Sequence, residues 1–317
     1  LGEHTEVPGA GSVCTYRFQG RGLRMMKLLD REITSRGIPV MYNAVAEQLL
    51  TDFDGKVVGV RAEFGGGGTS RRVGIRALKG TVLTCGGFEF DERMKLNYLR
   101  AYPTCFTGSA ANTGDGVRMA LDVGADLWHM NCCSASMVVK FPDYPLAFFV
   151  ELGGPGWIGR VRYSSTKREA AGYIVVDRNG ERFINENFIG TKLHSTYYEL
   201  TLFDNKRLEY PRVPSYWVFD RSRIEAGPLT TSASGASGPQ QLYQWSRDNS
   251  KELERGWIIS AETIRELASV LDIPADTLER TVRTYNLYCE NREDPDFGRE
   301  ARDLVPLSRP PFYAVKL

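Results

Sequence analysis

Residues Thr81–Phe90 read TVLTCGGFEF, an apolar run that ends in two glycines and two aromatic residues. Thr81–Cys85 is continuous and rich in β-branched residues, which is typical of a strand buried on both faces. Cys85 is expected to be buried and structural, because no neighbouring cation in the sequence would lower the pKa of its thiol. Glycine gives a strand no side chain to pack, so Gly86-Gly87 indicates either a turn through positive φ or a flat ligand against the backbone.

The segment upstream of this strand predicts a helix followed by a β-meander. Apolar residues recur at three- and four-residue steps over Gly22–Arg36, and Gly37 ends that helix. Asp54-Gly55 is a two-residue hairpin signal between the expected strands Glu47–Phe53 and Lys56–Phe64. A glycine-rich turn then leads to a third strand, Arg71–Ala77.

The segment downstream predicts two short helices, each with a recognisable start. Asp91 is a candidate cap for a helix over Asp91–Arg100. Asn112–Gly116, NTGDG, is a tight turn that opens a second helix, which Gly124 ends. A helix N-terminus presents free N–H groups, and a glycine turn lets a phosphate or a flat ring approach the backbone.

From about Asn131 the sequence loses any repeating strand–helix pattern. It predicts a strand over Gly172–Asp177, a turn at Arg178–Gly180 and a returning strand over Glu181–Asn185. The remaining expected elements are a strand at Tyr216–Asp220, a loop at Thr230–Gln241, and helices at Ser260–Leu271 and Pro274–Glu290.

Composition excludes several functional classes for this 317-residue chain. Its net charge of +1 gives no electrostatic case for nucleic acid or an anionic membrane surface. No apolar run reaches the roughly 20 residues of a membrane-spanning helix, and no export signal is visible, so a cytoplasmic location is expected. No metal site is expected, because the six cysteines and three histidines lack metal-binding spacing, and reduced thiols are the simplest interpretation.

In this order and spacing, these motifs resemble the flavoprotein superfamily of fumarate reductases, succinate dehydrogenase flavoprotein subunits and 3-ketosteroid dehydrogenases. The resemblance implies FAD as cofactor and covers nearly the whole chain, including GYIVVDRNGERFINE at Gly172–Glu186, which matches a hairpin of the cap domain. It places cofactor-binding positions in three parts of the chain. The first is Ala46, the second consists of Thr84, Cys85, Gly86 and Gly87, and the third consists of Thr113, Gly114 and Asp115.

The resemblance implies an α/β fold: part of a Rossmann-like FAD-binding domain with a β-meander, plus an α+β cap domain. The expected boundaries are 1–130 for the partial FAD-binding domain, 131–304 for the cap, and 305–317 for the return to the FAD-binding domain. The family's first GxGxxG strand and its last FAD segment have no counterpart here. The sequence is therefore interpreted as an internal piece of a longer enzyme, expected to bind FAD poorly and to be inactive by itself.

The catalytic acid or base is the least defined part of the resemblance. The position at which fumarate reductases have a proton-donating arginine is Gly190 in this sequence. The positions of the glutamate and arginine of their upstream proton relay are Thr166 and Glu169, and these differences argue against fumarate reduction. The ketosteroid dehydrogenases' tyrosine near Gly190 is also absent.

Four nearby side chains can transfer a proton or polarise a carbonyl, and the loop near the start adds a fifth candidate. The four are Lys192, His194, Tyr197 and Tyr198, of which His194 and Tyr198 are favoured, and the fifth is His4. A cation such as Lys192 would lower the pKa of a neighbouring tyrosine. The alternative is that the tyrosines pack in the core and that His194 is an ordinary surface residue. Arg178 and Arg182 are interpreted as solvated or structural, and Trp217, Trp245 and Trp257 as packing residues.

The resemblance implies an FAD-dependent oxidoreductase that transfers a hydride between the flavin and a carbon–carbon bond beside a carbonyl. A ketosteroid dehydrogenase-like or ene-reductase-like enzyme fits best, with a small-molecule enone, ketone or steroid-like substrate and an electron partner that the sequence does not identify. The alternatives are a dicarboxylate enzyme of the fumarate reductase or succinate dehydrogenase type, and a non-catalytic cap or binding module without flavin.

Overall fold

The computed structural model describes residues 21–65, 70–133, 137–152, 157–158, 161–162, 171–189, 193–230 and 243–317. These residues form two compact units. The first contains the described residues up to Phe88 together with Gly114–Trp128, and the second contains Glu89–Thr113 together with the chain from His129 onward.

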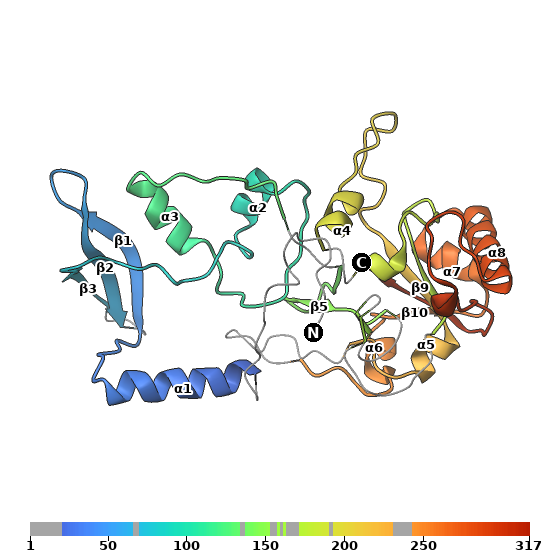
Figure 1. Cartoon of the computed structure of the whole chain (residues 1–317), viewed down its shortest axis with the longest axis horizontal. Helices are drawn as coiled ribbons and strands as arrows, with labels where there is room; N and C mark the ends of the chain where they lie inside the picture. Colours follow the sequence, from blue (N-terminus) through green and yellow to red (C-terminus); the bar gives the residue numbers. More distant parts are fainter. Residues whose placement is uncertain are drawn as a thin grey trace. The chain divides into compact units, whose positions relative to one another are not determined.

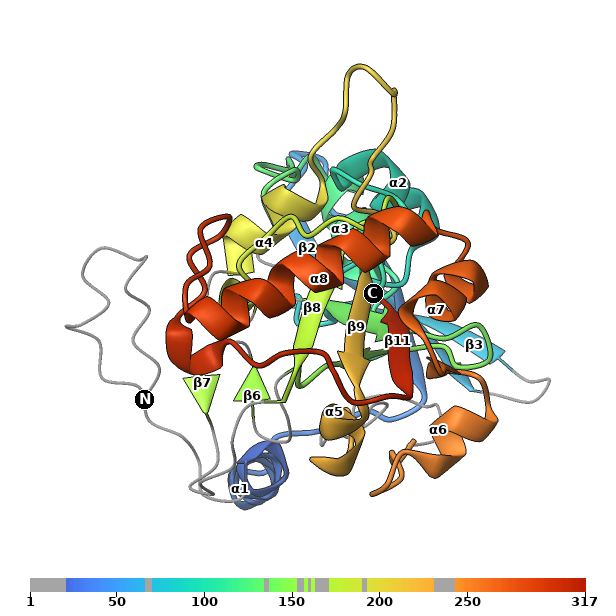
Figure 2. The same cartoon turned by 90° about the vertical axis from the view of Figure 1, so that its right-hand side faces the viewer.

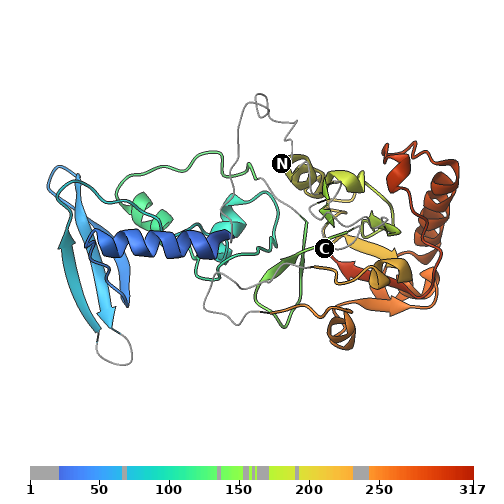
Figure 3. The same ribbon diagram turned by 60° about the horizontal axis from the view of Figure 1, so that its bottom comes forward.

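The first unit begins with the expected helix, α1, over Arg21–Ser35. Gly37 adopts φ 61° and ends it, and the Ile38 N–H returns to the Ile33 carbonyl at 3.1 Å. Figure 3 shows α1 as one uninterrupted helix. Its apolar side chains are exposed in the structure, with Leu23 at 70%, Met26 at 57% and Leu29 at 45%.

The expected β-meander follows and is confirmed (Figure 1). Its antiparallel strands are β1 (Ala44–Thr51), β2 (Val57–Gly65) and β3 (Ser70–Arg76), in the order β1-β2-β3. The first turn forms because the Asp52 carboxylate accepts the N–H groups of Asp54 and Lys56, while Gly55 takes φ 78°.

The predicted strand at Thr81–Cys85 does not form, which corrects the sequence-based expectation. These residues belong to no helix or strand, and Val82 is 85% exposed. Cys85 is exposed rather than buried. The physical reason is that a strand is stabilised by the ladder it shares with a neighbour, and in the described part of the chain no strand pairs with this segment.

The two short helices match the sequence signals closely. Helix α2 covers Glu92–Tyr98, and its cap Asp91 accepts the Met94 N–H at 2.8 Å. Helix α3 covers Asp115–Asp122, begins at Gly114 with φ 80°, and is followed by Gly124 with φ 93°. Helix α2 lies in the second unit and α3 in the first.

The second unit is built on a four-stranded antiparallel sheet of order β10-β11-β9-β8. The strands are β8 (Tyr173–Val176), β9 (Tyr216–Asp220), β10 (Ile259–Ala261) and β11 (Phe312–Lys316). Helices α7 (Ile264–Leu271) and α8 (Ala275–Asn291) pack on one face, as Figure 2 shows. That face buries Ile174, Val176, Val218 and Ala314 with apolar residues of both helices.

The opposite face of the sheet buries an aromatic-rich core. It contains Trp217, Phe219 and Tyr313 from the sheet, packed with Phe148 and Trp257. Trp217 is fully buried and Trp257 is 5% exposed, which supports packing as the role of these tryptophans. Two small hairpins lie in this part of the chain: β4 (Val138–Lys140) with β5 (Ala147–Phe149), and β6 (Trp157–Ile158) with β7 (Val161–Arg162).

Short helices connect these elements, and two boundaries differ from expectation. The connectors are η2 (Glu186–Phe188), α4 (Leu193–Leu200), α5 (Arg221–Glu225), α6 (Ser250–Glu254) and η3 (Ala301–Asp303). Ser260 lies in β10, and α7 begins after Thr263, whose capping box with Glu266 sets the start. The expected return strand at Glu181–Asn185 is reduced to one bridge, Val176 to Arg182, and the chain then passes into η2, whose cap is Asn185.

The division into an FAD-binding domain and a cap remains a prediction. The compact units place Glu89–Thr113 with the later part of the chain. Strand β11, in the segment expected to return to the FAD-binding domain, pairs with β9 and β10. Compactness alone does not assign either unit to cofactor or substrate.

Candidate functional site

The first unit brings two of the predicted cofactor-binding segments together. Gly86 adopts φ 83° and Gly114 adopts φ 80°, conformations that glycine takes without strain. The Gly114 N–H donates to the Gly87 carbonyl at 2.9 Å, which ties the paired glycines to the start of α3. The double glycine that ends TVLTCGG is therefore a turn through positive φ, at least at Gly86.

A cavity of about 260 Å³ adjoins these turns within the first unit. Most of its lining is small or apolar: Leu83, Cys85, Gly86, Gly116, Val117, Ala120, Leu121, Ala125, Asp126 and Leu127. A Cβ added to Gly116 would stand 2.5 Å from the Cys85 sulfur, so this position has no room for a side chain. Small residues, a helix N-terminus and an apolar wall fit a flat cofactor that carries phosphate groups.

The remaining predicted cofactor positions lie on exposed backbone or in local turns. Ala46 is exposed on β1, beside a bulge between Ala46 and Gln48. Asp115, in the first turn of α3, pairs with Arg118 at 2.5 Å. Thr113 donates its N–H to the Ala111 carbonyl at 2.9 Å. Thr84 lies in the irregular segment before the glycines.

The predicted catalytic residues fall on or near α4. Tyr197 and Tyr198 lie in this helix and their side chains are described. His194 belongs to the same helix, but its side chain is not among the described parts of the structure. Lys192 and His4 lie wholly outside the described residues. Gly190, Thr166 and Glu169, which distinguish this sequence from fumarate reductases, also lie outside the described residues.

Tyr197 is a buried anchor between α4 and the loop after α2. Its side chain is only 4% exposed, and its hydroxyl accepts the Arg100 N–H at 3.1 Å. Burial, together with a hydrogen bond to the Cys133 thiol, raises the pKa of Tyr197 to about 12. Such a phenol stays protonated at neutral pH, and its hydrogen bond with the Arg100 N–H connects α4 to the loop after α2.

Tyr198 is the accessible member of the pair, with 37% of its surface exposed. Its ring meets the Tyr197 ring edge-to-face at 5.8 Å, and the Arg100 guanidinium lies 5.0 Å from its ring centre. A hydrogen bond with the Cys132 thiol raises the pKa of Tyr198, partial burial adds to this effect, and the Arg100 charge opposes it. The pKa of neither tyrosine is lowered, which is opposite to the effect a neighbouring cation was expected to have.

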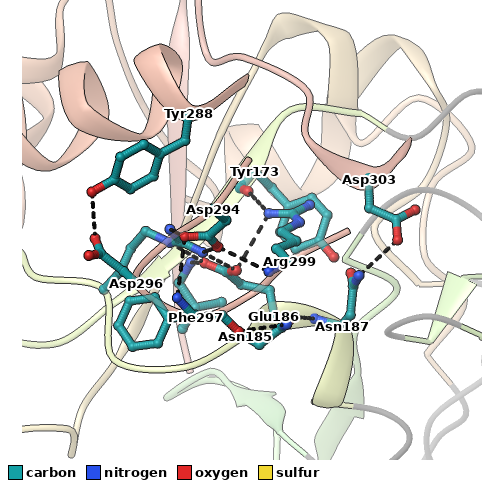
Figure 4. A network of polar contacts seen from close by, with 12 residues as sticks. Tyr173, Asn185, Glu186, Asn187, Tyr288, Asp294, Asp296, Phe297, Arg299 and Asp303 are labelled. Atoms are coloured by element: carbon teal, nitrogen blue, oxygen red, sulfur yellow. Dashed lines mark hydrogen bonds and ion pairs between the residues drawn. The ribbon is translucent and has the colours of Figure 1, made fainter. Parts of the chain in front are cut away.

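A buried network of ions supports the segment that leads into α4 (Figure 4). Arg182 donates to both oxygens of Glu186 at 2.9 and 2.8 Å and to Asp294 at 2.9 Å. Burial opposes ionisation of Asp294, but hydrogen bonds and the charge of Arg182 outweigh it and hold the pKa of that carboxyl below its usual value. Arg182 is therefore buried and structural, which is one of the two roles that the sequence suggested for it.

Arg299 and Asn187 extend this network. Arg299 is fully buried and donates to the Tyr173 carbonyl at 2.8 Å, and Asn187 donates to Asp303 at 2.8 Å, as Figure 4 shows. The network joins β8, η2 and the chain between α8 and β11. Sequence analysis missed it, because Arg182 and Asn187 lie more than a hundred positions from their partners Asp294 and Asp303.

Sequence analysis also missed Arg100, Cys132 and Cys133 as neighbours of the tyrosines. The adjacency of the two cysteines was the one available signal, and it did not indicate which side chains they contact. Across the described residues, no group of three or more His, Cys, Asp or Glu side chains is placed to hold a metal ion. Within the same residues, no helix combines the length and apolar character needed to cross a lipid bilayer.

The first unit thus combines glycine turns, a helix N-terminus and a mostly apolar cavity. The family model described as FAD binding domain matches residues 9–317. The chain belongs to this family of FAD-binding proteins, and FAD is the cofactor that the family indicates.

Similar proteins of known activity are dehydrogenases and reductases. The chain is 29% identical to the 3-oxosteroid 1-dehydrogenase of Mycolicibacterium smegmatis, over 97% of this chain and 52% of the relative. It is 24% identical to the vinyl phenol reductase of Lactiplantibacillus plantarum, over 99% of this chain and 61% of the relative. The chain thus spans about half the length of the 3-oxosteroid dehydrogenase and somewhat more of the reductase.

Solved structures share the fold. The 3-ketosteroid delta1-dehydrogenase of Sterolibacterium denitrificans superimposes with a TM-score of 0.67 at 21% identity, covering 91% of this chain and 49% of that one. A flavocytochrome c3 fumarate reductase gives a TM-score of 0.57 at 22% identity, covering 95% of this chain and 45% of that one. At these identities the likeness concerns the fold, and it confirms the α/β flavoprotein architecture.

Proposed function

We propose that the whole protein is an FAD-dependent oxidoreductase that transfers a hydride between the flavin and a carbon–carbon bond beside a carbonyl. Family membership supports the cofactor, and the named relatives include a 3-oxosteroid 1-dehydrogenase and a vinyl phenol reductase. The observation that carries the proposal is the family match over residues 9–317, and Tyr198, a partly exposed phenol on α4, is the proposed proton-transfer group.

The chain's glycine turns hold the cofactor in this proposal. Gly86, Gly87 and Gly114 allow a flat ring or a phosphate to approach the backbone, and Asp115 offers a carboxylate to a hydroxyl group. Thr84, Cys85, Thr113 and the backbone of Ala46 complete the proposed contacts. When bound, FAD supplies the hydride donor or acceptor, and the protein supplies orientation and proton transfer.

Tyr198 acts on the substrate as a hydrogen-bond donor. A protonated phenol can donate to a carbonyl oxygen and stabilise the negative charge that develops there during hydride or proton transfer. Tyr197, buried behind it, holds the helix in place. His194, Lys192 and His4 remain candidates for the second proton-transfer group. The substrate class is a small-molecule enone, ketone or steroid-like compound, with a cytoplasmic location and an electron partner still to be identified.

The test is Tyr198→Phe in the full-length, FAD-loaded protein, assayed by flavin reduction or reoxidation with a panel of enones, ketones and fumarate. Loss of a positioned acid typically lowers turnover by about 10²–10⁴, while substrate affinity should change far less. Fumarate should not be turned over, since its proton-donor position is Gly190. The matched control is Tyr288→Phe on α8, which likewise removes the hydroxyl group of a partly exposed tyrosine. The Tyr288 hydroxyl donates to Asp296.

The control variant should keep the parental rate. If Tyr198→Phe also turned over every active substrate at the parental rate, Tyr198 would have no catalytic part. If no enone or ketone reacted with the parent protein, the proposed reaction itself would be wrong.

A further inference from the structure

A surface groove of about 710 Å³ follows helix α8 in the second unit, beside the start of α7. Figure 2 shows α8 lying across the sheet. Most of the lining residues belong to α8, and the lining includes Ile264, Glu279, Val282, Arg283, Leu287 and Glu290. Ile264 and Val282 are 9% and 6% exposed, whereas Leu287 is 51% exposed. The groove therefore joins buried apolar residues to an apolar side chain that faces solvent.

Three exposed residues of α8 form a stripe in this groove that is positive, apolar and negative in that order. Arg283, Leu287 and Glu290 are spaced by four and then three residues, which places them on one face of the helix. Seven residues of α-helix rise about 10.5 Å, so the two charges are separated by roughly that distance along the axis. Opposite charges on either side of an apolar residue make the stripe complementary to a second, antiparallel copy of itself.

Both charges of the stripe are unpaired within the described part of the chain. There, Arg283 and Glu290 form no ion pair and no side-chain hydrogen bond. By contrast, Glu279 lines the same groove and is held by Arg265 of α7 at 2.6 Å. The charges that flank Leu287 are therefore available to a partner of the opposite sign.

We propose that this face of α8 is a self-association surface, on which a second copy of the chain docks antiparallel. The twofold axis lies beside Leu287, midway between Arg283 and Glu290. Arg283 of each copy then meets Glu290 of the other, so the same ion pair forms twice, and the two Leu287 side chains cover each other at the axis. Such a contact is isologous and closes at two copies.

The length of α8 sets the strength of this association. Its 17 residues span about 25 Å, so one pair of helices covers less than the roughly 800 Å² per partner of a standard interface. A contact of this size fits a reversible dimer with a Kd of about 10–100 µM. Its ion pairs lie among exposed residues, and the screening length falls from about 10 Å at 0.1 M salt to about 3 Å at 1 M. High salt should therefore weaken the dimer.

Sedimentation equilibrium of the full-length protein, at low and at high salt, measures the association. Arg283→Glu and Glu290→Arg each place like charges opposite one another at both ends of the contact. Each should raise the dimer Kd about 10–30-fold, because two exposed pairs change from attraction to repulsion. Lys251→Glu is the matched control, since it makes the same change of charge at an exposed position of α6 that does not line the groove. It should leave the Kd unchanged.

Mixing the two reversed variants separates charge pairing from any damage to the fold. The Arg283→Glu variant has acidic side chains at both positions of the stripe, and the Glu290→Arg variant has basic ones. In a mixed dimer both ion pairs are restored, so the mixture should associate with a Kd near that of the parent. The double variant, Arg283→Glu with Glu290→Arg, should also dimerise, because both pairs return with their signs exchanged.

A parent protein that stays monomeric at several hundred micromolar would overturn the proposal. So would a dimer that neither reversal weakens, because it would use another surface. Failure of both the mixture and the double variant to associate would equally exclude pairing between Arg283 and Glu290. The measurement needs neither substrate nor turnover, so each of these results leaves the proposed reaction to its own test.

Discussion

At Gly116, in the first turn of α3, an added Cβ would stand 2.5 Å from the Cys85 sulfur, so the Cys85 side chain would have to move. Gly116→Ala should destabilise the first unit by about 1–3 kcal/mol, the usual cost of an overpacked site. It should also weaken FAD binding, because Cys85 must move toward the cavity. Thermal unfolding and an FAD titration of the full-length protein are the measurements.

The double variant Cys85→Ala with Gly116→Ala isolates the cause. Removing the sulfur should recover most of the loss, so the two substitutions should be strongly non-additive. Gly22→Ala is the matched control, because no atom lies within 4 Å of a Cβ built there. Additive effects in the double variant would show that the sulfur contact is not responsible.

At the scale of elements, the turn after β8 carries two arginines with different roles. Arg182 is 5% exposed and joins Glu186 and Asp294, whereas Arg178 is 45% exposed and pairs with Glu209. Arg182→Gln leaves two buried carboxylates without their shared cation, which typically costs about 3–5 kcal/mol. Arg178→Gln removes a surface pair worth about 0–1 kcal/mol.

Urea unfolding followed by tryptophan fluorescence measures this difference, because the buried residues Trp217 and Trp257 report on the second unit. The Arg182 variant should unfold at clearly lower urea, and the Arg178 variant close to the parent. Equal stabilities of the two variants would mean that the network of Figure 4 contributes no more than a surface ion pair.

At the scale of the whole molecule, the two units differ in how much apolar surface they bury. Apolar residues of α1 are exposed, while α8 buries Leu278, Val282 and Tyr285 against the sheet. Helices with few buried contacts open at low cost. We therefore expect the amides of α1 to exchange hydrogen much faster than those of α8 in the FAD-free protein. Equal protection of the two helices would show that α1 is covered in solution.

Sequence analysis correctly predicted the helices and turns whose boundaries are set by residues only a few positions away. The glycine after α1, the Asp54-Gly55 turn and the Asp91 cap all act within a few residues, and these elements formed as expected. The strand at Thr81–Cys85 failed because its stability depends on a partner strand. The Thr263–Glu266 capping box was visible in the sequence and would have placed the start of α7 correctly.

The candidate site divides in the same way. The glycines of both turns were visible in the sequence, but the hydrogen bond between Gly114 and Gly87 was not predicted. The contacts of Tyr198 with Arg100 and of Arg182 with Asp294 join residues far apart in the chain, and no local pattern specifies them. The direction of the tyrosine pKa shifts depends on burial and on distant neighbours, which the sequence does not specify.

Strand β11 occupies an inner position of the sheet, between β10 and β9, although it follows β9 in the chain by about ninety residues (from Asp220 to Phe312). When β8 and β9 leave the ribosome, the strand that should cover the second edge of β9 does not yet exist. At about 5–20 residues per second, the interval from β9 to β11 is on the order of ten seconds. During that time the apolar segments YIVV and YWVFD expose an unpaired backbone edge, which can pair with other chains. Production of this protein should therefore depend on chaperones that shield nascent strands, and heterologous expression should improve at low temperature or with such chaperones in excess.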